Sequence, residues 1–348
     1  MSCKFLLVRT DRIGDTVLTL PAVTALRDQF PDCHLSFLAR SYTEPLLKRY
    51  AGIDEVRIYD PEGPHQGWSG MLRLAEELRR EQFDAAVLFH PRPELALPLF
   101  LARIPLRVGS ADRWYRFLFT HAIRQHRSRC ERHEGEYNQE LITPLLATES
   151  TPALEFHFQP AQVSPIRQLF PDAPEAFRYA VIHPGSGGSA PNLSEEQYRM
   201  CVEVLLEETD WRVVLTGGVG DRGRMEQIAA GLASERVHLA PGGLSLEQLL
   251  DLIAGASLLI GSSTGPLHLA DAMGTPLLGF YCPAVPYTPD RWGPYQQREW
   301  VITSPVQGPR RCDSRRCPNG KCLELLSGVE LRSRLQKRLQ TAEAQDAR

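Results

Sequence analysis

The stretch GSSTGPLHLADAMGTPLLGFY, residues 261–281, joins two apolar runs through a segment rich in glycine and hydroxyl side chains. The run at 257–260 and the run at 276–281 each predict a buried strand. About two helical turns lie between them, and the proline in this segment suits the first position of a helix. Ser262, Ser263 and Thr264 are therefore expected at the carboxyl end of a strand, where a helix begins.

The turn between strand and helix has two interpretations. Backbone amides at a helix start have no partner within the helix and attract anions, so the turn predicts a phosphate site. Ordinary capping of a helix also favours serine and threonine. The turn by itself leaves both interpretations open.

The composition is that of a soluble two-domain protein. The chain has 348 residues, 43% hydrophobic and 23% charged, and a formal net charge of −3. This length suits two domains, and the charge argues against a nucleic-acid partner. No apolar run approaches the roughly 20 residues that cross a bilayer, and the N-terminus predicts no signal peptide. We therefore expect a cytoplasmic protein whose 8 cysteines are thiols.

Short apolar runs alternate with helical patterns along the chain, which predicts an α/β protein with doubly wound parallel sheets. A proline-bearing interval, roughly 159–176, is the predicted linker. We expect one domain at 1–165, a second at 175–328, and a helix at 329–348 that packs back on the first domain. The carboxyl ends of both sets of strands are expected to face a central cleft, because such sheets bind ligands there.

The first candidate loop is RTDRIGD, residues 9–15, directly after the first predicted strand. Asp15 is a candidate general base for a hydroxyl group, and helix capping is the structural alternative. Asp11 is the weaker candidate, because nothing places it as close to the helix start. Arg9 and Arg12 either hold an anionic acceptor or are solvated.

The second candidate loop is HPGSGGSA, residues 183–190. Gly185, Gly187 and Ala190 formally satisfy the GxGxxG/A pattern, which would indicate an NAD-linked oxidoreductase. Ser194 is the predicted helix cap, so the loop is longer than that pattern requires. A loop of small residues that wraps a diphosphate is favoured, and the second domain is the predicted home of a phosphate-bearing ligand.

Seven motifs together resemble glycosyltransferase family 9, the ADP-heptose:lipopolysaccharide heptosyltransferases and their relatives. They are RIGDTVLTLPAV at 12–23, LRVGS at 106–110, RHEGEYN at 132–138, HPGSGG at 183–188, LTGG at 215–218, STGPLHLADAMGTPLLGFY at 263–281 and RWGPY at 291–295. They follow the family's order over nearly the full length. The resemblance implies the GT-B fold, with two Rossmann-like domains that bind the acceptor and the nucleotide-sugar donor, respectively.

The resemblance also implies roles for single residues. Asp15 matches the proposed catalytic base, and inversion at the anomeric carbon is the implied outcome. The residues that match donor-binding positions are Ser186, Gly187, Asp221, Ser263, Thr264, Gly265 and His268. The chain has no Asp-x-Asp pair, so we expect no metal at the diphosphate and no cofactor.

We expect transfer of a heptose or related sugar, with ADP-heptose as the leading donor, to a lipopolysaccharide core or similar glycan. Two departures from the family pattern keep an alternative open. Many members have a lysine after HPG, where SAPNLSEEQY at 189–198 has none, and an aspartate where this chain has Ser263. A different nucleotide-sugar donor, or a weakened member that only binds sugar nucleotides or carbohydrates, is the competing hypothesis.

The basic tail around Cys312, Cys317 and Cys322 is the remaining unusual segment. The cysteines are spaced more widely than those of a zinc knuckle, which favours packed or redox-sensitive thiols over a metal site. Basic residues of this tail, and four in the first half, are either solvated or attract a phosphorylated glycolipid or the inner face of the inner membrane. Those four are Arg124, Arg127, Arg129 and Arg132.

Overall fold

The protein forms two compact units. A computed structural model describes residues 3–146, 151–160, 165–185, 187–188, 190–232, 235–305 and 322–346. The first unit comprises 1–127 and 132–159, and the second comprises 128–131 and 160–348. The main division thus falls at the start of the interval predicted as a linker.

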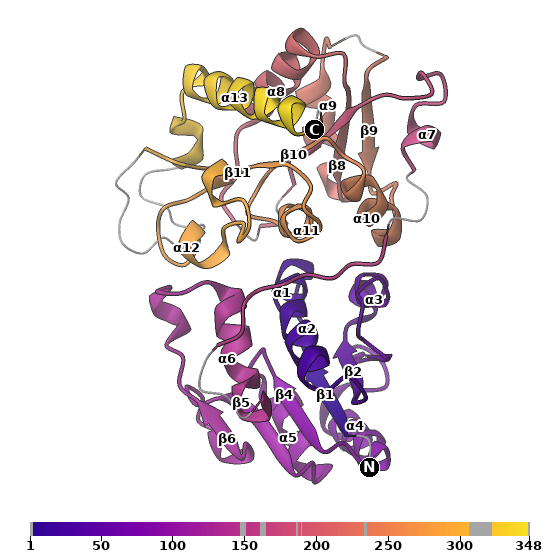
Figure 1. The fold of residues 1–348 in the computed structure, drawn as a ribbon, viewed down its shortest axis with the longest axis vertical. Helices are drawn as coiled ribbons and strands as arrows, with labels where there is room; N and C mark the ends of the chain where they lie inside the picture. Colours follow the sequence, from indigo (N-terminus) through magenta and orange to yellow (C-terminus); the bar gives the residue numbers. More distant parts are fainter. Residues whose placement is uncertain are drawn as a thin grey trace. The chain divides into compact units, whose positions relative to one another are not determined.

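The first unit is built on a parallel six-stranded sheet with the order β3-β2-β1-β4-β5-β6 (Figure 1). Its strands are β1 (Lys4–Val8), β2 (His34–Ala39), β3 (Glu55–Ile58), β4 (Ala85–Leu88), β5 (Leu106–Ser110) and β6 (His121–Ile123). The central strands β1 and β4 pair in register from Phe5 with Ala85 onward. Both are almost wholly apolar, as a parallel strand covered on both faces must be.

Helices cover this sheet. They are α1 (Ile13–Val17), α2 (Leu20–Gln29), α3 (Glu44–Lys48), α4 (Gly67–Glu81), α5 (Pro93–Leu101) and α6 (Glu134–Leu146). Helix α2 packs on α6, and α4 packs on α5. Short 3-10 turns, η1 (Ser41–Thr43), η2 (Arg116–Leu118) and η3 (Arg127–Arg129), lie in the connections.

The second unit repeats the plan with a parallel six-stranded sheet of order β12-β11-β10-β7-β8-β9 (Figure 1). Its strands are β7 (Tyr179–His183), β8 (Arg212–Gly217), β9 (Val237–Pro241), β10 (Leu258–Ser262), β11 (Leu277–Tyr281) and β12 (Val301–Thr303). Its helices are α7 (Ile166–Leu169), α8 (Glu195–Glu208), α9 (Arg222–Ala229), α10 (Leu246–Ala254), α11 (Gly265–Met273), α12 (Pro289–Trp292) and α13 (Gly328–Asp346). The predicted pair of doubly wound parallel sheets is confirmed.

The start of α8 follows the predicted capping box. The Ser194 hydroxyl accepts from the Gln197 amide at 3.2 Å, and the Gln197 side chain accepts from the Ser194 amide at 2.9 Å. This reciprocal pair fixes the first turn of the helix and therefore delays its start beyond the glycine loop.

The last helix, α13, lies in the second unit, where it packs on α8. Leu331, Leu335 and Leu339 are buried along one side of it. Arg338 is buried as well, and its Nε donates to the Leu277 carbonyl at 3.0 Å. This differs from the expectation that 329–348 packs back on the first domain, because the apolar stripe of the helix is covered within its own unit.

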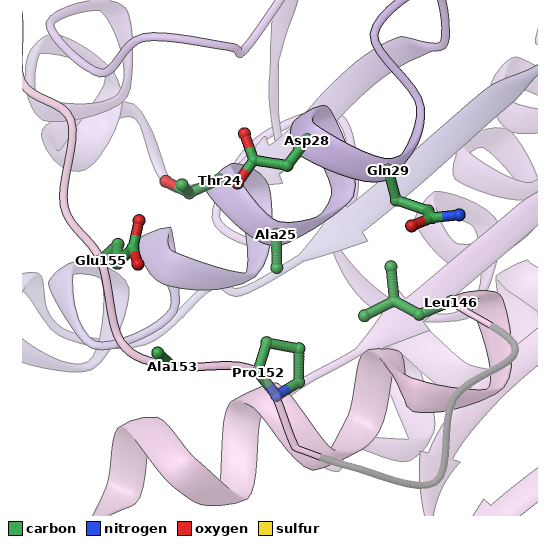
Figure 2. Close-up of a pocket in the computed structure, with 8 residues that line it drawn as sticks. All are labelled: Thr24, Ala25, Asp28, Gln29, Leu146, Pro152, Ala153 and Glu155. Carbon is green, nitrogen blue, oxygen red and sulfur yellow. The ribbon is translucent and has the colours of Figure 1, made fainter.

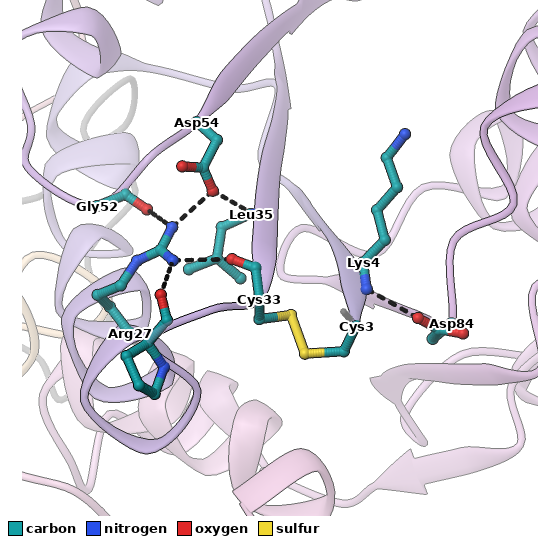
Figure 3. The surroundings of a disulfide bond; sticks show 9 residues. Cys3, Lys4, Arg27, Cys33, Leu35, Gly52, Asp54 and Asp84 are labelled. Atoms are coloured by element: carbon teal, nitrogen blue, oxygen red, sulfur yellow. Dashed lines mark hydrogen bonds and ion pairs between the residues drawn. A yellow bond between two sulfur atoms is a disulfide. The ribbon is translucent and has the colours of Figure 1, made fainter. Parts of the chain in front are cut away.

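Cys3 and Cys33 form a disulfide between the chain segments that lead into β1 and β2, with a Cα–Cα distance of 4.7 Å (Figure 3). The thiol prediction is wrong for this pair. The two cysteines are 30 residues apart in sequence, and only the pairing of adjacent parallel strands brings them together. Beside them Arg27 donates to the carbonyls of Cys33 and Gly52, so the same region of the unit is also held by hydrogen bonds (Figure 3).

The described helices include none with both the length and the apolar character of a membrane-spanning segment.

We predict that Leu335→Ala destabilises the second unit by about 2–5 kcal/mol, because removal of a buried leucine leaves a cavity between α13 and the rest of the unit. Urea unfolding followed by circular dichroism measures the change. Val329→Ala on the same helix is the matched control, since Val329 is 82% exposed and should stay within about 0.5 kcal/mol of the unmodified protein. Equal midpoints for the two variants would contradict the packing described for α13.

Candidate functional site

A buried arginine organises the loop after β1. Arg9 is only 2% exposed and lies where β1 ends. Its Nε is 2.6 Å from Asp11 Oδ1, and its Nη2 is 2.6 Å from Asp15 Oδ1. Its Nη1 is 3.4 Å from Glu134 Oε1 of helix α6. One guanidinium thus links three carboxylates from two distant segments of the chain.

Helix α6 supports this arrangement from the other side. The buried Glu134 carboxylate also accepts from Arg127. Asn138 Oδ1 accepts from Arg9 Nη1 at 3.3 Å and from Arg127 Nη2 at 3.2 Å, while its Nδ2 donates to the Leu18 carbonyl at 2.9 Å. Glu134 and Asn138 were not among the predicted site residues, although both lie in the RHEGEYN motif that resembles the family.

The charges of this cluster shift the acidity of its members. Burial raises the pKa of Asp15 to about 6; Arg9 opposes that shift, while Asp11 and Glu134 add to it. Burial alone would lower the pKa of Arg9, but Asp11, Asp15 and Glu134 outweigh it and raise the pKa, so the guanidinium stays charged. A carboxylate with a pKa near neutrality is suited to accept a proton from a hydroxyl group.

The structure separates the two interpretations of this loop. Asp15 lies in the first turn of α1, whose N-cap Arg12 makes no side-chain cap. The Asp15 carboxylate contacts Arg9 rather than the helix start and is 18% exposed. Arg9 is buried and paired with three carboxylates, and its acceptor role stays a prediction. Arg12 is exposed, and its acceptor role stays a prediction.

A pocket of about 450 Å³ opens beside the same cluster. His90 follows β4, and its Nδ1 is 3.2 Å from Asp11 Oδ2. Burial lowers the pKa of His90, against the pull of Asp11. The full lining is His90, Pro91, Arg92, Pro93, Arg113, Trp114 and Tyr115. Sequence reasoning missed this pocket, although the segments that line it follow β4 and β5 at their carboxyl ends.

A second pocket of the first unit, about 360 Å³ in volume, lies between α2 and the segment at 152–155 (Figure 2). It is lined by Thr24, Ala25, Asp28, Gln29, Leu146, Pro152, Ala153 and Glu155. None of these residues belongs to a loop that follows a strand, so this pocket is not part of the candidate site.

In the second unit, the start of α11 carries an unsatisfied polar group. Thr264 is the N-cap of this helix, has extended backbone angles (φ −139°, ψ 166°) and makes no side-chain cap. Its Oγ1 is buried without a hydrogen-bond partner among the described residues, and the residue is 7% exposed. Gly265 follows as the first helical residue and is half-buried. A buried hydroxyl at a helix start, without a hydrogen-bond partner in the described part of the chain, favours an anion site over ordinary capping.

Neighbouring side chains of this turn have defined places. The Ser263 side chain contacts Tyr281 of β11, and His268 is buried one turn inside the helix. Asp271, further along α11, accepts from the Gln296 amide at 3.2 Å. Burial raises the pKa of Asp271 to about 6, against the effect of these backbone amides. Asp271 thereby ties the segment after the RWGPY motif to α11.

Two glycines of the loop after β7 have a backbone conformation that favours glycine. Gly187 (φ +53°) and Gly188 (φ +71°) adopt left-handed angles with open space beside them. A residue with a side chain would be strained there. Ser186, another predicted donor-binding residue, lies outside the described residues. Gly187 and Gly188 are both exposed.

Asp221 has a local structural partner. Its Oδ2 accepts from the Gly218 amide at 2.8 Å, and a side chain at Gly185 would meet that oxygen at 2.5 Å. Burial lowers the pKa of nearby His183 to about 4, although Asp221 opposes that shift. The geometry therefore explains Asp221 as a cap of the turn after β8, and its contact with a nucleoside stays a prediction.

No cluster of three or more potential metal ligands occurs within the residues that the structure describes. Cys312 and Cys317 lie outside those residues, and Cys322 is a buried thiol in the turn η6 (Cys322–Leu325). The cysteine tail is therefore not a described part of the site.

Two solved structures share this architecture. A member of glycosyl transferase family 9 from Veillonella parvula superimposes with a TM-score of 0.82 at 19% identity, covering 98% of both chains. The Escherichia coli heptosyltransferase WaaC, solved with ADP, superimposes with a TM-score of 0.73 at 20% identity, covering 96% of this chain and 99% of its own. The likeness confirms the predicted GT-B fold.

Sequence comparison defines the family. A putative glycosyltransferase of Haemophilus influenzae is 32% identical over 84% of this chain and 86% of its own length. Lipopolysaccharide heptosyltransferase 3 of Escherichia coli is 23% identical over 77% and 80%, respectively. The model of glycosyltransferase family 9 (heptosyltransferase) matches residues 71–323. Because that match spans most of the chain, including the loops at the ends of β7, β8 and β10, this protein is a glycosyltransferase and belongs to glycosyltransferase family 9, the heptosyltransferase family.

Proposed function

We propose that this protein transfers a heptose, or a related sugar, from ADP-heptose to a lipopolysaccharide core or similar glycan, with inversion. The observation that carries the proposal is the Asp15 carboxylate, partly accessible and held by Arg9 with a pKa of about 6. Relatives named as lipopolysaccharide heptosyltransferases and the ADP-bound neighbour support the choice of donor and acceptor.

The second unit supplies the donor site in this proposal. The diphosphate lies at the start of α11, where Thr264 Oγ1 and the Gly265 amide donate to it. His268 is placed one helical turn further in. The loop around Ser186 and Gly187 wraps the other side of the diphosphate, and Ser263 and Asp221 complete the set. Negative charge that develops on the leaving diphosphate is stabilised by the helix dipole and these donors.

The first unit supplies the base and the acceptor pocket. Asp15 takes the proton of the acceptor hydroxyl while the oxygen of that hydroxyl forms a bond to the anomeric carbon. The bond from that carbon to the diphosphate oxygen breaks on the opposite face, so ADP leaves and the configuration inverts. Arg92 and Arg113, which line the 450 Å³ pocket, suit an acceptor with an anionic group. Arg12 is the further candidate for this contact.

Two departures from the family pattern favour a competing function. The segment at 189–198 contains no lysine, and Ser263 stands where many members have an aspartate. Loss of both charges fits a donor other than ADP-heptose, or a member that binds sugar nucleotides without turnover. Release of nucleoside diphosphate from ADP-, GDP-, UDP- and dTDP-sugars distinguishes these possibilities from the proposed reaction.

A peripheral membrane contact is part of the same proposal, because the acceptor is a glycolipid. Trp114 and Phe117 are 78% and 68% exposed, and their ring centroids are 6.3 Å apart. The intervening Tyr115 and the following Leu118 are buried, so the loop holds the two aromatic rings outward. The exposed Arg113 and Arg116 accompany them. Aromatic rings beside arginines suit the interface of a bilayer with anionic headgroups.

We predict that Asp15→Asn lowers kcat by roughly 10²–10⁴-fold, the usual contribution of a general base. The asparagine oxygen can still accept from Arg9. Burial disfavours the charged form of Asp15, so its replacement by a neutral amide should not lower thermal stability above pH 6. ADP affinity should stay the same, since the donor belongs to the other unit. Steady-state kinetics with ADP-heptose and a glycan acceptor measures the effect.

The pH profile provides the control. A base must be deprotonated, so kcat/KM of the unmodified enzyme should rise as the pH increases through about 6 and then level off. Asp15→Asn should lack this rising limb. Asp11→Asn removes a neighbouring carboxylate from the same arginine and should keep the limb with a smaller loss of rate. Normal turnover by Asp15→Asn would exclude Asp15 as the base.

We predict that Thr264→Val raises the stability of the free protein by ~1 kcal/mol, since a buried hydroxyl without a partner is replaced by a methyl group. The same change should weaken ADP binding about tenfold or more, because a hydrogen bond to a charged group contributes ~1.5–3 kcal/mol. Thermal unfolding and calorimetric titration with ADP measure the two effects. Gly265→Leu, which blocks approach to the backbone, should weaken ADP as well; unchanged ADP affinity in both variants would refute the donor site.

We predict that the unmodified protein co-sediments with vesicles of phosphatidylcholine and phosphatidylglycerol, and that a Trp114→Ser/Phe117→Ser double variant loses most of this binding. Trp68→Ser is the matched control, since Trp68 is also largely exposed but lies on α4. Turnover of a water-soluble acceptor should be retained by the single variant Phe117→Ser, because Phe117 does not line the 450 Å³ pocket. Equal vesicle binding by the double variant and the control would exclude this loop as the membrane contact.

A further inference from the structure

Asn192 connects the two candidate phosphate loops of the second unit. Its Oδ1 accepts from the Tyr198 hydroxyl at 2.6 Å and from the Ser262 hydroxyl at 2.6 Å. Its Nδ2 donates to the Pro184 carbonyl. Tyr198 belongs to α8, Ser262 ends β10, and Pro184 begins the glycine loop. One carboxamide therefore joins three elements through hydrogen bonds.

The positions of these partners matter for the site. Ser262 precedes the orphaned hydroxyl of Thr264 by two residues, and Pro184 precedes the left-handed glycines Gly187 and Gly188. Tyr198 and Ser262 are fully buried, and their hydroxyls are 3.2 Å apart. The separation between the glycine loop and the start of α11 is thus set inside the protein, by groups that have little room to move.

Arg224 of α9 closes the glycine loop at both ends. Its Nη1 donates to the Pro184 carbonyl at 3.1 Å, and its Nη2 donates to the Leu193 carbonyl at 3.1 Å. Its Nε donates to Glu195 at 2.8 Å, which fixes the orientation of the guanidinium. Arg224 thus holds Pro184 and Leu193, while Gly187 and Gly188 between them stay exposed.

We propose that Asn192 is a positioning residue that sets the distance between the two diphosphate-binding loops, with Arg224 as the clamp of the glycine loop. The proposal rests on the donor site proposed above. In it, Asn192 and Arg224 support the site but do not contact the ligand. A diphosphate that spans both loops binds tightly only if the separation of the loops is correct to within a fraction of an ångström.

The side-chain amide at position 192 acts both as a hydrogen-bond acceptor and as a hydrogen-bond donor. Its oxygen must accept from two hydroxyls, and its nitrogen must donate to the Pro184 carbonyl. An aspartate keeps the shape and the acceptor but, when ionised, has no donor and faces that carbonyl with a negative charge. When protonated, it regains an O–H donor. Asn192→Asp therefore makes the spacing of the loops depend on pH.

The test is calorimetric titration of the full chain with ADP at several pH values. Asn192→Asp should bind ADP at least about tenfold more weakly than the unmodified protein at pH 8, a loss of ~1.4 kcal/mol. It should regain part of this affinity as the pH falls toward 5, relative to the unmodified protein at the same pH. Arg224→Ala should weaken ADP binding without this dependence on pH.

Gln197→Glu is the matched control. Gln197 lies in the first turn of α8 as well, and its buried Nε2 donates to the carbonyls of Leu323 at 3.0 Å and Leu326 at 2.9 Å. The control also replaces a buried amide with an acid, and it should lower thermal stability. It should leave ADP affinity unchanged, because the carbonyls that Nε2 contacts lie in the segment that precedes α13, and a glutamate oxygen can still accept from the Ser194 amide.

The outcomes separate this inference from the proposed function. ADP binding by the unmodified protein together with equal binding by Asn192→Asp would overturn the inference alone. Equal losses of affinity in Asn192→Asp and Gln197→Glu would also overturn it, because the effect would then be a general loss of stability. If Asn192→Asp does not fold, normal ADP affinity in Arg224→Ala overturns the clamp. No binding of ADP, GDP, UDP or dTDP by the unmodified protein would overturn the donor site and this inference together.

Discussion

The guanidinium of Arg9 is the group on which the first unit's candidate site depends. It is buried where β1 ends, and it neutralises carboxylates from the following loop and from α6. Without this cation, three acids would be held together in a poorly solvated place, at a cost of several kcal/mol per unpaired ion. The arrangement keeps Asp15 close enough to a charge to ionise, yet buried enough to hold its pKa near 6.

The second unit uses its polar groups in a different way. Asn192, Tyr198 and Ser262 satisfy one another in the interior. The Thr264 hydroxyl, two residues further on, is buried without a partner in the described part of the chain. Buried polar groups are almost always paired, so an orphan at a helix start is a cost that a bound anion would remove. One unit therefore balances its charges internally, whereas the other has a buried hydroxyl without a partner among the described residues.

The departures from the family pattern have a structural counterpart. Where many members have a lysine, the segment at 189–198 is held by Asn192 and by Arg224, which approaches from α9. Arg224 uses its donors on carbonyls of the loop and on Glu195, so the cation is committed to the shape of the loop. In the proposed donor site Arg224 is thus not available to replace that lysine, and the exposed Gly187 and Gly188 become more important for binding.

The sequence by itself determined the two doubly wound sheets and the positions of three loops at strand ends, because the period of apolar residues and the cap at Ser194 are local properties of the chain. It also marked Asp15 and Thr264 as candidate site residues, and these roles stay predictions. Only the tertiary structure decided that Arg9 is paired with Glu134 of α6, that His90 contacts Asp11, and that Cys3 pairs with Cys33. It likewise placed α13 in the second unit. Such contacts join residues far apart in the chain, and their partners are selected by strand order and helix packing, which no local pattern encodes.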